Sequence, residues 1–378
     1  MTQEEICHIA FTIEQALGHK THGKNLQEIV SNDPTIQAHW ALPAWDVQGF
    51  SARLPLYNSN WTIRAGWRAR RALARLQKEQ ALDALFFHTQ VTAVLAPDWL
   101  RRFPSVVSLD ATPLQYDRLG AYYDHDTGPR WMEQLKWRLN RDCFRAAGRL
   151  VTWSAWARQG LIDDYQVPAA KVTVIPPGVN VPAWTRPTPR TAHSGPLKIL
   201  FVGGNLERKG GLLLLDVYRH LYQESLANGR TPPPELHLVT RDAIDPQPGV
   251  SVYNEMAPNS EALKRLYFQS DIFCLPTYGD ALPMVLSEAG AAGLPLISTA
   301  VAAIPEIVED GESGFLIPPG DGPALATALR TLLENPPLRL RQGESAAQAV
   351  RHEFDAEKNG QRLLALLKHI ITHTRARG

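Results

Sequence analysis

The sequence is poor in cysteine and carries almost no net charge. Its three cysteines, Cys7, Cys143 and Cys274, lie far apart and form neither a CxxC pair nor a Cys/His zinc spacing. This argues against a disulfide framework or a zinc site and favours a reducing compartment. The formal net charge of +1 differs from the strongly basic excess with which nucleic-acid binders neutralise phosphates. We therefore expect no nucleic-acid partner.

Long apolar runs are also absent. No uninterrupted run approaches the roughly 18 residues needed to cross a bilayer. Near its start the chain carries Glu4 and Glu5 where a signal peptide carries basic residues, and no apolar stretch follows them. These features predict a cytoplasmic protein that reaches the inner face of the membrane at most as a peripheral protein.

The chain length and the distribution of charge indicate separate domains. At roughly 100 to 200 residues per domain, 378 residues suffice for two or three cores. Residues 1–190 contain 22 basic and 17 acidic side chains, a balance of +5, whereas residues 191–378 contain 17 and 21, a balance of −4. A proline-rich stretch at 182–196 is typical of a linker. We predict domains at 1–190 and 191–356, with a C-terminal helix at about 357–375 that packs back on the first.

Both halves alternate short β-branched runs with helical patterns, which predicts βαβ units and an α/β fold with two doubly wound parallel sheets. Predicted strands occupy 6–12, 84–88, 105–109, 150–153 and 172–175, then 198–202, 236–240, 272–275, 295–298 and 314–317. Predicted helices of the second half lie near 210–222, 259–269, 283–292 and 322–334. Open parallel sheets bind ligands at the carboxyl ends of their strands, so two such domains predict an interdomain cleft.

A glycine-rich segment at 201–211, FVGGNLERKGG, follows a predicted strand and precedes a predicted helix. Gly203 and Gly204 permit close approach of the backbone to a ligand. Arg208 and Lys209 place two cations beside a helix N-terminus, as diphosphate binding requires. The segment has neither the Walker order nor the dinucleotide fingerprint. A solvated turn with two surface cations is the alternative, and the segment alone does not decide between them.

A second segment, at 270–293, has the order strand, loop, helix. Pro283 suits the first helical turn, where its missing N–H costs nothing, so the preceding loop should direct free amides toward a ligand. Asp280 in this loop could accept hydrogen bonds from sugar hydroxyls, and Glu288, eight residues later, could hold a ribose diol. The alternatives are an aspartate that caps the helix and a glutamate that faces solvent.

Taken together, these segments resemble the retaining glycosyltransferases of family four, also described as glycosyl transferases group 1. The acidic pair of that family, Glu-x7-Glu, corresponds to Asp280-x7-Glu288, and the similarity extends almost throughout residues 270–321. The segment 201–211 resembles the diphosphate loop of the same family. The resemblance implies the GT-B fold, with two Rossmann-like domains facing a cleft.

The resemblance also implies roles for residues of the second half. Arg208 and Lys209 would hold the donor diphosphate and stabilise the charge of the departing nucleoside diphosphate. Glu288 would hold the ribose hydroxyls, and Asp280 would contact the transferred sugar. Backbone amides from Ala281 to Met284 would meet sugar or phosphate oxygens. Substrate binding is assigned to Gly203, Gly204, Ala281, Leu282, Pro283, Met284 and Val285 as well.

Two positions depart from the family pattern. The family usually has glutamate where this chain has Asp280, and the shorter side chain alters the reach toward the sugar. Many members carry arginine where this chain has Gly204, and Arg208 could compensate for that loss of charge.

The first half resembles the family less specifically, as expected for the part that recognises variable acceptors. Gly18, after the first predicted strand, resembles the glycine-bearing loop near the donor phosphates and the acceptor. His88 closes the strand 84–88 and resembles the second histidine of a strand-end pattern. A structural histidine with satisfied hydrogen bonds is an equally good interpretation of His88.

Asp110 stands where many family members have a histidine that faces the donor sugar. An ionised aspartate only accepts hydrogen bonds, so a sugar hydroxyl must donate to it. A close carboxylate could also stabilise positive charge at the anomeric carbon. The alternative is an aspartate that caps the segment beginning at Ala111, and we favour the catalytic interpretation.

Two basic stretches also carry tryptophans. Because helical spacing gathers their arginines on one face, either stretch could approach an anionic lipid surface or an acidic acceptor. A solvated, ion-paired face is the favoured alternative. The stretches are 130–149, with Arg138, Arg141, Arg145 and Arg149 near Trp131 and Trp137, and 64–78, with Arg68, Arg70, Arg71 and Arg75 near Trp61 and Trp67.

The resulting hypothesis is a retaining hexosyltransferase that moves a sugar from a nucleoside-diphosphate sugar to a hydroxyl of a lipid, a polysaccharide, a small metabolite or a protein. By resemblance, the acceptor attacks on the face that the leaving group vacates, and a donor phosphate oxygen takes its proton. We expect no metal or other cofactor, because Arg208 and Lys209 supply the charge that magnesium provides elsewhere. The only Asp-x-Asp, at 124–126, is interpreted as a solvated loop.

Three alternatives remain open. A nucleotide-sugar epimerase or a glycogen-phosphorylase-like enzyme could share the two-domain plan, although the sequence offers no context for a pyridoxal-binding lysine. A noncatalytic sugar-nucleotide-binding subunit is the third, since Asp110 and Asp280 both depart from the family pattern. Release of nucleoside diphosphate from a nucleotide sugar would separate a transferase from a binder.

Overall fold

A computed structural model of the chain describes residues 6–15, 19–44, 60–120, 128–229 and 232–376. The chain divides into two compact units. Of the described residues, the first unit contains those up to 118 with 128–177 and 356–376, and the second contains 119–120 and those from 178 to 355. Before the C-terminal helix, the last residue of the first unit is Pro177, whereas the expected domain boundary was at residue 190.

The first unit contains a six-stranded parallel sheet in the order β2-β1-β3-β4-β5-β6. Its strands are β1 (Cys7–Ile13), β2 (Ile36–Ala41), β3 (Ala84–His88), β4 (Ser105–Leu109), β5 (Arg149–Thr152) and β6 (Val172–Val174). The five predicted strands are confirmed, whereas β2 was not predicted. It lies at the edge of the sheet, and its middle residues are only partly buried, so it lacks the continuous apolar run of the inner strands.

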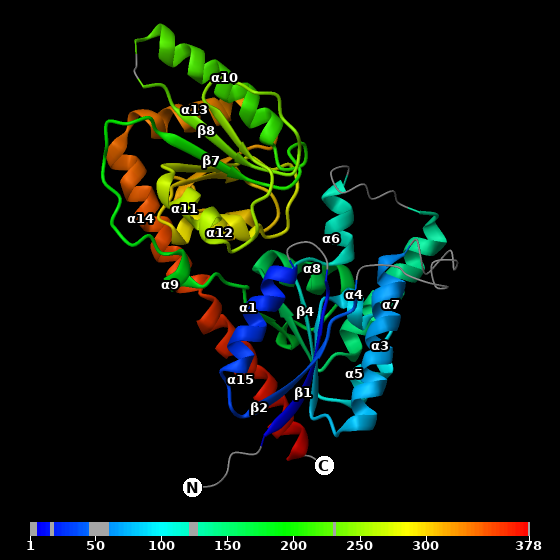
Figure 1. Cartoon of the computed structure of the whole chain (residues 1–378). Helices are drawn as coiled ribbons and strands as arrows, with labels where there is room; N and C mark the ends of the chain where they lie inside the picture. The colour runs from blue at the N-terminus through cyan, green and yellow to red at the C-terminus, as the bar shows by residue number, and fades with distance from the viewer. Residues whose placement is uncertain (1–5, 16–18, 45–59, 121–127, 230–231, 377–378) are drawn as a thin grey trace. The chain divides into compact units, whose positions relative to one another are not determined.

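Two layers of helices enclose this sheet (Figure 1). One face is covered by α1 (His19–Ser31) and α15 (Ala356–Arg375), and the other by α3 (Trp61–Glu79), α4 (Gln90–Ala93), α5 (Pro97–Arg102) and α7 (Arg130–Ala146). The unit also contains α6 (Pro113–Arg118) and α8 (Ala155–Tyr165). Leu363 and Leu367 of α15 are buried with Ile29 of α1 and Phe86 of β3. The C-terminal helix therefore belongs to the core of the first unit.

The second unit repeats this plan with a sheet in the order β12-β11-β10-β7-β8-β9. Its strands are β7 (Lys198–Val202), β8 (Glu235–Val239), β9 (Val250–Tyr253), β10 (Ile272–Leu275), β11 (Leu296–Thr299) and β12 (Gly314–Ile317). Its helices are α9 (Val181–Trp184), α10 (Gly211–Ala227), α11 (Glu261–Gln269), α12 (Met284–Ala291), α13 (Gly322–Glu334) and α14 (Pro336–Glu353). The predicted strands and helices are confirmed. The edge strand β9 and the helices α9 and α14 were not predicted, and α9 overlaps the start of the stretch at 182–196 that was predicted as a linker.

The centre of the second sheet positions the candidate site. Strands β7 and β10 are neighbours, with Ile272 opposite Ile199. From β7 the chain continues to β8 and β9 on one side, whereas β10 leads to β11 and β12 on the other. The strand order therefore reverses between β7 and β10, and ligands of doubly wound sheets bind at the carboxyl ends of the strands at such a point.

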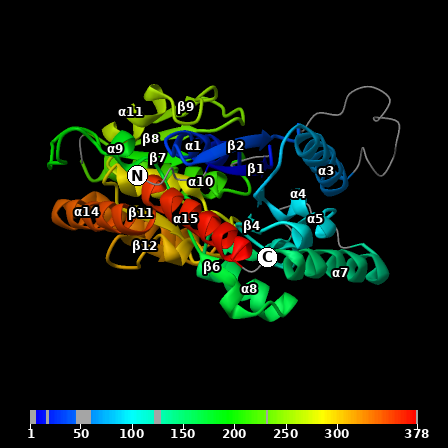
Figure 2. The ribbon, with the colours of Figure 1, turned by 90° about the horizontal axis from the view of Figure 1, so that it is seen from below.

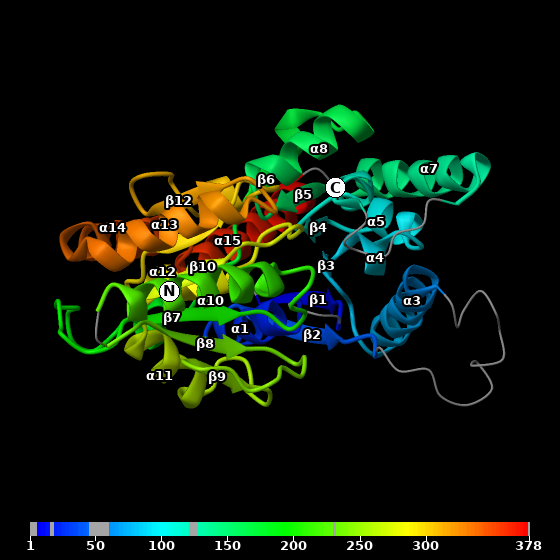
Figure 3. The same cartoon turned by 90° about the horizontal axis from the view of Figure 1, so that it is seen from above.

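Helices α3 and α7 lie on one side of the first unit and keep many residues exposed. Figures 2 and 3 show α3 and α7 on either side of α4 and α5. Among the described residues, no helix combines the length and the apolar character needed to span a bilayer.

Candidate functional site

The loop that follows β7 is held in place by polar contacts of its own backbone. Gly203 N–H donates to the carbonyl of Val239 at 2.9 Å. Leu206 N–H donates to a carboxylate oxygen of Asp242 at 2.6 Å, so the residues after β8 support this loop. Asn205 Oδ1 accepts from the backbone N–H of Arg208 at 2.7 Å, which closes a turn immediately before the two cations.

Arg208 joins this loop to the one that follows β10. Its backbone carbonyl accepts from Tyr278 N–H at 2.9 Å and from the Thr277 hydroxyl at 3.2 Å. Its guanidinium donates to the carbonyl of Gly279 at 2.7 Å. The two segments that sequence analysis singled out are therefore one structure, built at the carboxyl ends of adjacent strands.

Gly210 makes this close approach between the loops possible. Its φ of +73° is in the left-handed region, and a Cβ at this position would lie 1.9 Å from the carbonyl oxygen of Pro276. No other residue fits between these backbones without displacing one of them. Gly210 thus allows the loop after β7 to pack against the backbone at Pro276.

Lys209 and Asp280 form an ion pair across the two loops. Their side chains are 14 % and 15 % exposed, so both are largely removed from water. Burial and then the charge of Arg208 lower the pKa of Lys209 well below its usual value, and the adjacent carboxylate of Asp280 acts in the opposite direction. A solvated turn with surface cations is therefore the wrong description. Asp280 does not cap α12 either, because the N-cap residue is Pro283 and no side chain caps the helix.

Glu288 points into the protein from the second turn of α12. It is 7 % exposed, and its Oε2 accepts from the hydroxyl of Tyr267 at 2.9 Å. Burial raises the pKa of Glu288 to about 7, partly opposed by this hydrogen bond. Burial and the neighbouring Glu288 raise the pKa of Tyr267 well above its usual range. The alternative of a solvent-facing glutamate is wrong.

The remaining predicted residues of this half lie along the same loops. Ala281, Leu282 and Pro283 are buried, whereas Met284 and Val285 in the first turn of α12 are partly exposed. The Ala281 carbonyl accepts from the N–H of Ala303 at 3.1 Å, which ties the loop to the residues after β11.

Gly204 is exposed and lies beside Arg241, a residue that follows β8. A Cβ built on Gly204 would be 3.5 Å from Nε of Arg241. The position where many family members carry arginine is therefore next to a guanidinium from another loop. Arg208, which sequence analysis suggested as the substitute, is directed at Gly279 instead.

In the first unit, His88 lies in a cluster of aromatic rings at the end of β3. It is fully buried, and its Nε2 lies 3.0 Å from Nδ1 of His19. Trp153 stacks on its ring at 5.2 Å, and the His22 ring is 4.9 Å away. Burial and the neighbouring histidines lower the pKa of His88 well below its usual value and that of His22 to about 3. These two imidazoles are therefore neutral at physiological pH.

Asp110 follows β4, the strand next to β3, and is 7 % exposed. One carboxylate oxygen accepts from Ala111 N–H at 2.9 Å, and the other accepts from the hydroxyl of Tyr116. The capping interaction that sequence analysis weighed as an alternative is thus present. Gly18 and the Asp-x-Asp at 124–126 lie outside the described residues.

Sequence analysis missed several residues that shape the site. Asp242 follows a strand at its carboxyl end, where a polar residue is a usable signal. Tyr267 and His19 gave no local signal, because their partners Glu288 and His88 are distant in sequence. Trp153 was predicted as the last residue of a strand, and no role in a site was predicted for it.

Comparison with known families assigns both halves of the chain. Residues 196–335 match the model described as "Glycosyl transferases group 1". Residues 31–182 match the model described as "Glycosyltransferase Family 4". The two models fall on different halves of the chain and together span most of it.

Individual relatives are similar over about half of their length. A D-inositol 3-phosphate glycosyltransferase of Corynebacterium kroppenstedtii is 29 % identical over 224 residues, which cover 53 % of this chain and 49 % of that protein. A putative colanic acid biosynthesis glycosyltransferase, WcaL of Escherichia coli K12, is 29 % identical over 231 residues, covering 56 % and 54 %. The chain thus spans about half the length of these relatives.

Solved structures show the same fold at low identity. A sucrose-phosphate synthase from Thermosynechococcus elongatus superposes with a TM-score of 0.72 at 15 % identity, covering 97 % of this chain and all of the other. HepE of Anabaena in complex with UDP-glucose gives a TM-score of 0.68 at 16 % identity, covering 96 % and 99 %. With one family model on each half, the chain belongs to family four of the glycosyltransferases, the glycosyl transferases group 1, and has the GT-B fold.

Proposed function

We propose that this chain is a retaining glycosyltransferase that transfers a sugar from a nucleoside-diphosphate sugar to a hydroxyl acceptor. The observation that carries the proposal is the joint between the loops after β7 and β10. It gathers Arg208, Lys209 and Asp280 at the reversal point of the sheet, with Glu288 in the helix that follows. Cations for a diphosphate and carboxylates for hydroxyls are the groups that a nucleotide sugar needs.

The proposed roles follow from the chemistry of each group. Arg208 and Lys209 bind the diphosphate, Glu288 accepts from the ribose hydroxyls, and Asp280 accepts from the transferred sugar. Gly203, Gly204, Pro283 and the amides of Ala281, Leu282, Met284 and Val285 line the donor. Lys209 is paired with Asp280, so the donor phosphates would compete with this carboxylate for the amine.

In the proposed reaction, the bond between the anomeric carbon and the diphosphate oxygen breaks while the acceptor oxygen bonds to the same carbon. The acceptor proton passes to a phosphate oxygen, and the nucleoside diphosphate leaves with the electron pair of the broken bond. Attack on the face that the leaving group vacates retains the anomeric configuration. Arg208 and Lys209 stabilise the developing negative charge, and Asp110 would oppose the positive charge on the sugar.

We propose that the reaction needs no metal, because Arg208 and Lys209 supply two positive charges to the diphosphate. The first unit would receive the acceptor, with the neutral imidazoles of His22 and His88 near its hydroxyl. A neutral imidazole both donates and accepts hydrogen bonds, as a hydroxyl does. The cleft that would bring donor and acceptor together remains a prediction.

A donor panel tests the proposal directly. The pure protein is incubated with UDP-, GDP-, ADP- and TDP-sugars, with and without EDTA, and release of nucleoside diphosphate is measured beside thermal stabilisation. We expect release from one donor class, undiminished by EDTA, and loss of release in Lys209→Ala. Arg219→Ala, in an exposed pair with Asp216 on α10, is the matched control and should retain release.

The same panel separates the alternatives. Stabilisation by a nucleoside diphosphate without release, even with acceptor mixtures, would indicate a noncatalytic binder. Conversion of the sugar without an acceptor would indicate an epimerase. Once an acceptor is found, the anomeric coupling constant of the product reports whether configuration is retained.

One surface of the first unit supports an acceptor at an anionic membrane. Helix α7 exposes Trp131, Leu135 and Leu139 at four-residue intervals, with exposed fractions of 67 %, 49 % and 42 %. Arg138 and Arg145 are exposed on the same helix and form no ion pair with another described residue. An apolar stripe flanked by free arginines fits the interface of an anionic bilayer. We therefore propose peripheral contact through α7.

A further inference from the structure

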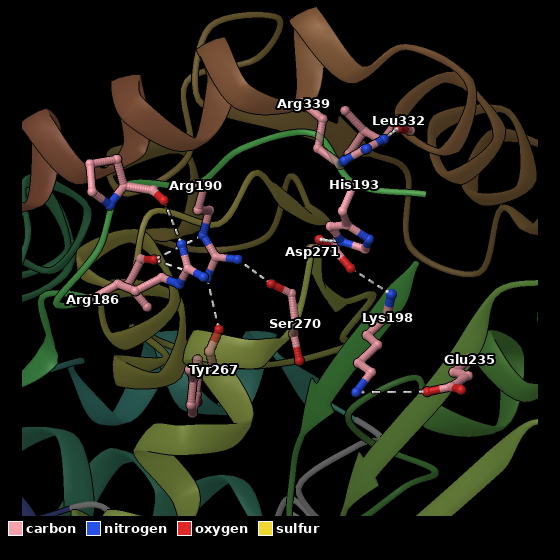
Figure 4. Close-up of polar contacts among 12 residues, drawn as sticks. Arg186, Arg190, His193, Lys198, Glu235, Tyr267, Ser270, Asp271, Leu332 and Arg339 are labelled. Atoms are coloured by element: carbon pink, nitrogen blue, oxygen red, sulfur yellow. Dashed lines mark hydrogen bonds and ion pairs between the residues drawn. The ribbon is translucent and has the colours of Figure 1, made fainter. Parts of the chain in front are cut away.

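Arg190 lies in the segment that enters the second unit, and its guanidinium contacts the ends of two helices (Figure 4). It donates to the carbonyl of Tyr267 at 2.8 Å, to that of Ala292 at 3.0 and 3.1 Å, and to that of Ser270. Tyr267 and Ser270 lie at the C-terminal end of α11, and Ala292 is the C-cap residue of α12. Arg190 therefore joins the ends of α11 and α12.

Electrostatics favours this arrangement. The last carbonyls of a helix lack intrahelical donors and carry partial negative charge, so a cation stabilises them. Burial, and then the charge of Arg186, lower the pKa of Arg190 to about 10, which leaves the guanidinium charged at neutral pH. Because the hydrogen bonds use four of its five N–H groups, the guanidinium is fixed in one orientation.

The two helices that Arg190 joins carry the Tyr267–Glu288 hydrogen bond of 2.9 Å. The Tyr267 ring meets the edge of Trp184 at 5.0 Å and stacks on Phe273 at 5.6 Å. Trp184 and Arg190 belong to the same short segment that enters the unit. This segment therefore holds Tyr267 both by its ring and by its backbone carbonyl.

We infer that Arg190 is a positioning residue for the nucleotide site. By holding the ends of α11 and α12 together, it keeps the Tyr267 hydroxyl on Glu288 and so orients the carboxylate that receives the donor ribose. The inference rests on the role proposed for Glu288. Arg190 acts through the two helices and touches no substrate.

The test replaces Arg190 with methionine, which keeps an unbranched side chain and removes every donor. We expect the KM for the donor sugar to rise about tenfold while kcat changes by less than about twofold, since ground-state binding of the nucleotide is weakened. Because the Tyr267 hydroxyl lowers the pKa of Glu288, its displacement shifts the pH midpoint of nucleoside-diphosphate affinity upward. Tyr267→Phe should shift this pH midpoint in the same direction. Arg190→Lys keeps the charge and can reach one carbonyl. Its KM should therefore lie between those of the wild type and Arg190→Met.

Two arginines provide matched controls. Arg186 lies in the same segment, and its guanidinium donates to the carbonyls of Thr188 and Pro189. Arg339 is buried and donates at 2.6 Å to the carbonyl of Leu332 in the last turn of α13 (Figure 4). Arg339→Met therefore removes another buried guanidinium from a helix end, and the hydrogen bond that is lost belongs to α13 and not to α11 or α12. We expect it to lower Tm and leave the pH midpoint unchanged, and Arg186→Met to change neither.

Two results would overturn the inference. One is a wild-type KM and pH midpoint in both Arg190 variants, and the other is an equal shift of the midpoint in Arg339→Met. The unliganded protein gives a reading that is independent of activity, because the pH dependence of its unfolding free energy also reports the pKa of Glu288. If the wild type binds no nucleoside diphosphate, the proposed function fails. The comparison of unliganded wild type, Arg190→Met and Tyr267→Phe still decides the role of Arg190.

Discussion

Glu288 is half protonated near neutral pH because burial raises its pKa to about 7. The ionised form of this carboxyl only accepts hydrogen bonds, so it would receive the hydroxyls of a ribose diol better than the protonated form, whose O–H is a donor. If Glu288 receives the donor ribose as proposed, the affinity for the nucleotide would depend on release of this proton. The imidazoles of His22 and His88 exchange no proton between pH 6 and 8, because burial and the neighbouring histidines hold their pKa values well below this range.

We expect the affinity for the correct nucleoside diphosphate to rise several-fold as the pH increases from 6 to 8, with release of a proton on binding. Glu288→Gln should abolish this dependence and lower the affinity. Calorimetric titration in buffers of different ionisation enthalpy measures the proton count. An affinity that is independent of pH in the wild type would contradict the role of Glu288.

The same group affects folding, with the sign set by its raised pKa. Between the ordinary value of 4.5 and the folded value of about 7, the folded chain holds a proton that the unfolded chain releases. The free energy of unfolding therefore falls as the pH rises through this window, by roughly 3 kcal/mol in total. Denaturant titrations at several pH values should show this fall in the wild type and lose it in Glu288→Gln.

Asp280 offers a test that separates sugar from nucleotide. In Asp280→Asn we expect turnover of the nucleotide sugar to fall on the order of a hundredfold, because a carboxylate beside the reacting sugar is lost. Affinity for the free nucleoside diphosphate should be retained or increased, because the carboxylate no longer competes for Lys209. Equal losses of turnover and of diphosphate affinity would show that Asp280 serves the fold of the loops.

At the scale of the elements, the joint between the loops after β7 and β10 depends on Gly210. Gly210→Ala would place a Cβ 1.9 Å from the Pro276 carbonyl oxygen at a φ of +73°. We expect a loss of more than about 3 kcal/mol in unfolding free energy and loss of diphosphate binding, because steric overlap adds to the strain of the left-handed backbone.

Gly229 provides the control for this substitution. Its φ is +65°, but no atom lies within 4 Å of a Cβ built there. Gly229→Ala should therefore cost only about 1 kcal/mol, the strain of the left-handed backbone alone. Similar losses in the two variants, measured by thermal and denaturant unfolding, would show that the contact with Pro276 relaxes freely.

The sequence predicted all eight inner strands of the two sheets but only two of the four edge strands, β6 and β12. Strands β3, β4, β7 and β10 are almost wholly buried and rich in apolar residues, as is typical of parallel strands covered on both faces. The edge strands β2 and β9 have mixed burial and no continuous apolar run, so periodicity gave no strand there. The edge strands β6 and β12 are also only partly buried and were still predicted, so an edge position weakens the local pattern without always removing it.

The candidate site shows the same limit. The identities of Arg208, Lys209, Asp280 and Glu288 could be predicted because each lies in a recognisable segment. Their mutual contacts could not, since Lys209 and Asp280 are 71 residues apart in sequence. The hydrogen bonds from Arg190 to the ends of α11 and α12 could not be predicted either. Their acceptors are backbone carbonyls, whose positions no side-chain identity encodes.

At the scale of the whole molecule, the excess of positive charge lies in the first half of the chain. We expect the protein to sediment with vesicles that contain anionic lipid and to dissociate as salt increases, because α7 combines an apolar stripe with free arginines. The double substitution Trp131→Ala with Leu135→Ala should reduce binding at least about fivefold, and Arg138→Glu should reduce it further.

Leu212 and Leu226 on α10 give the matched control, since they are 54 % and 46 % exposed in the other unit. Their replacement by alanine should leave vesicle binding unchanged. Equal binding to vesicles of neutral lipid, or equal loss in the α10 variant, would contradict a specific role of α7. A salt-insensitive dimer that disappears with Trp131→Ala would instead show that this face meets a second copy.

The position of α15 has a consequence for biosynthesis. Leu363, Leu364, Leu367 and Ile371 complete the core of the first unit, although the ribosome translates them after the whole of the second unit. During translation the nascent first unit therefore presents the apolar groove of α1 and its sheet uncovered until the last helix emerges. The unit that is made first is the one that finishes folding last, and chaperones that hold nascent chains would meet it in that state.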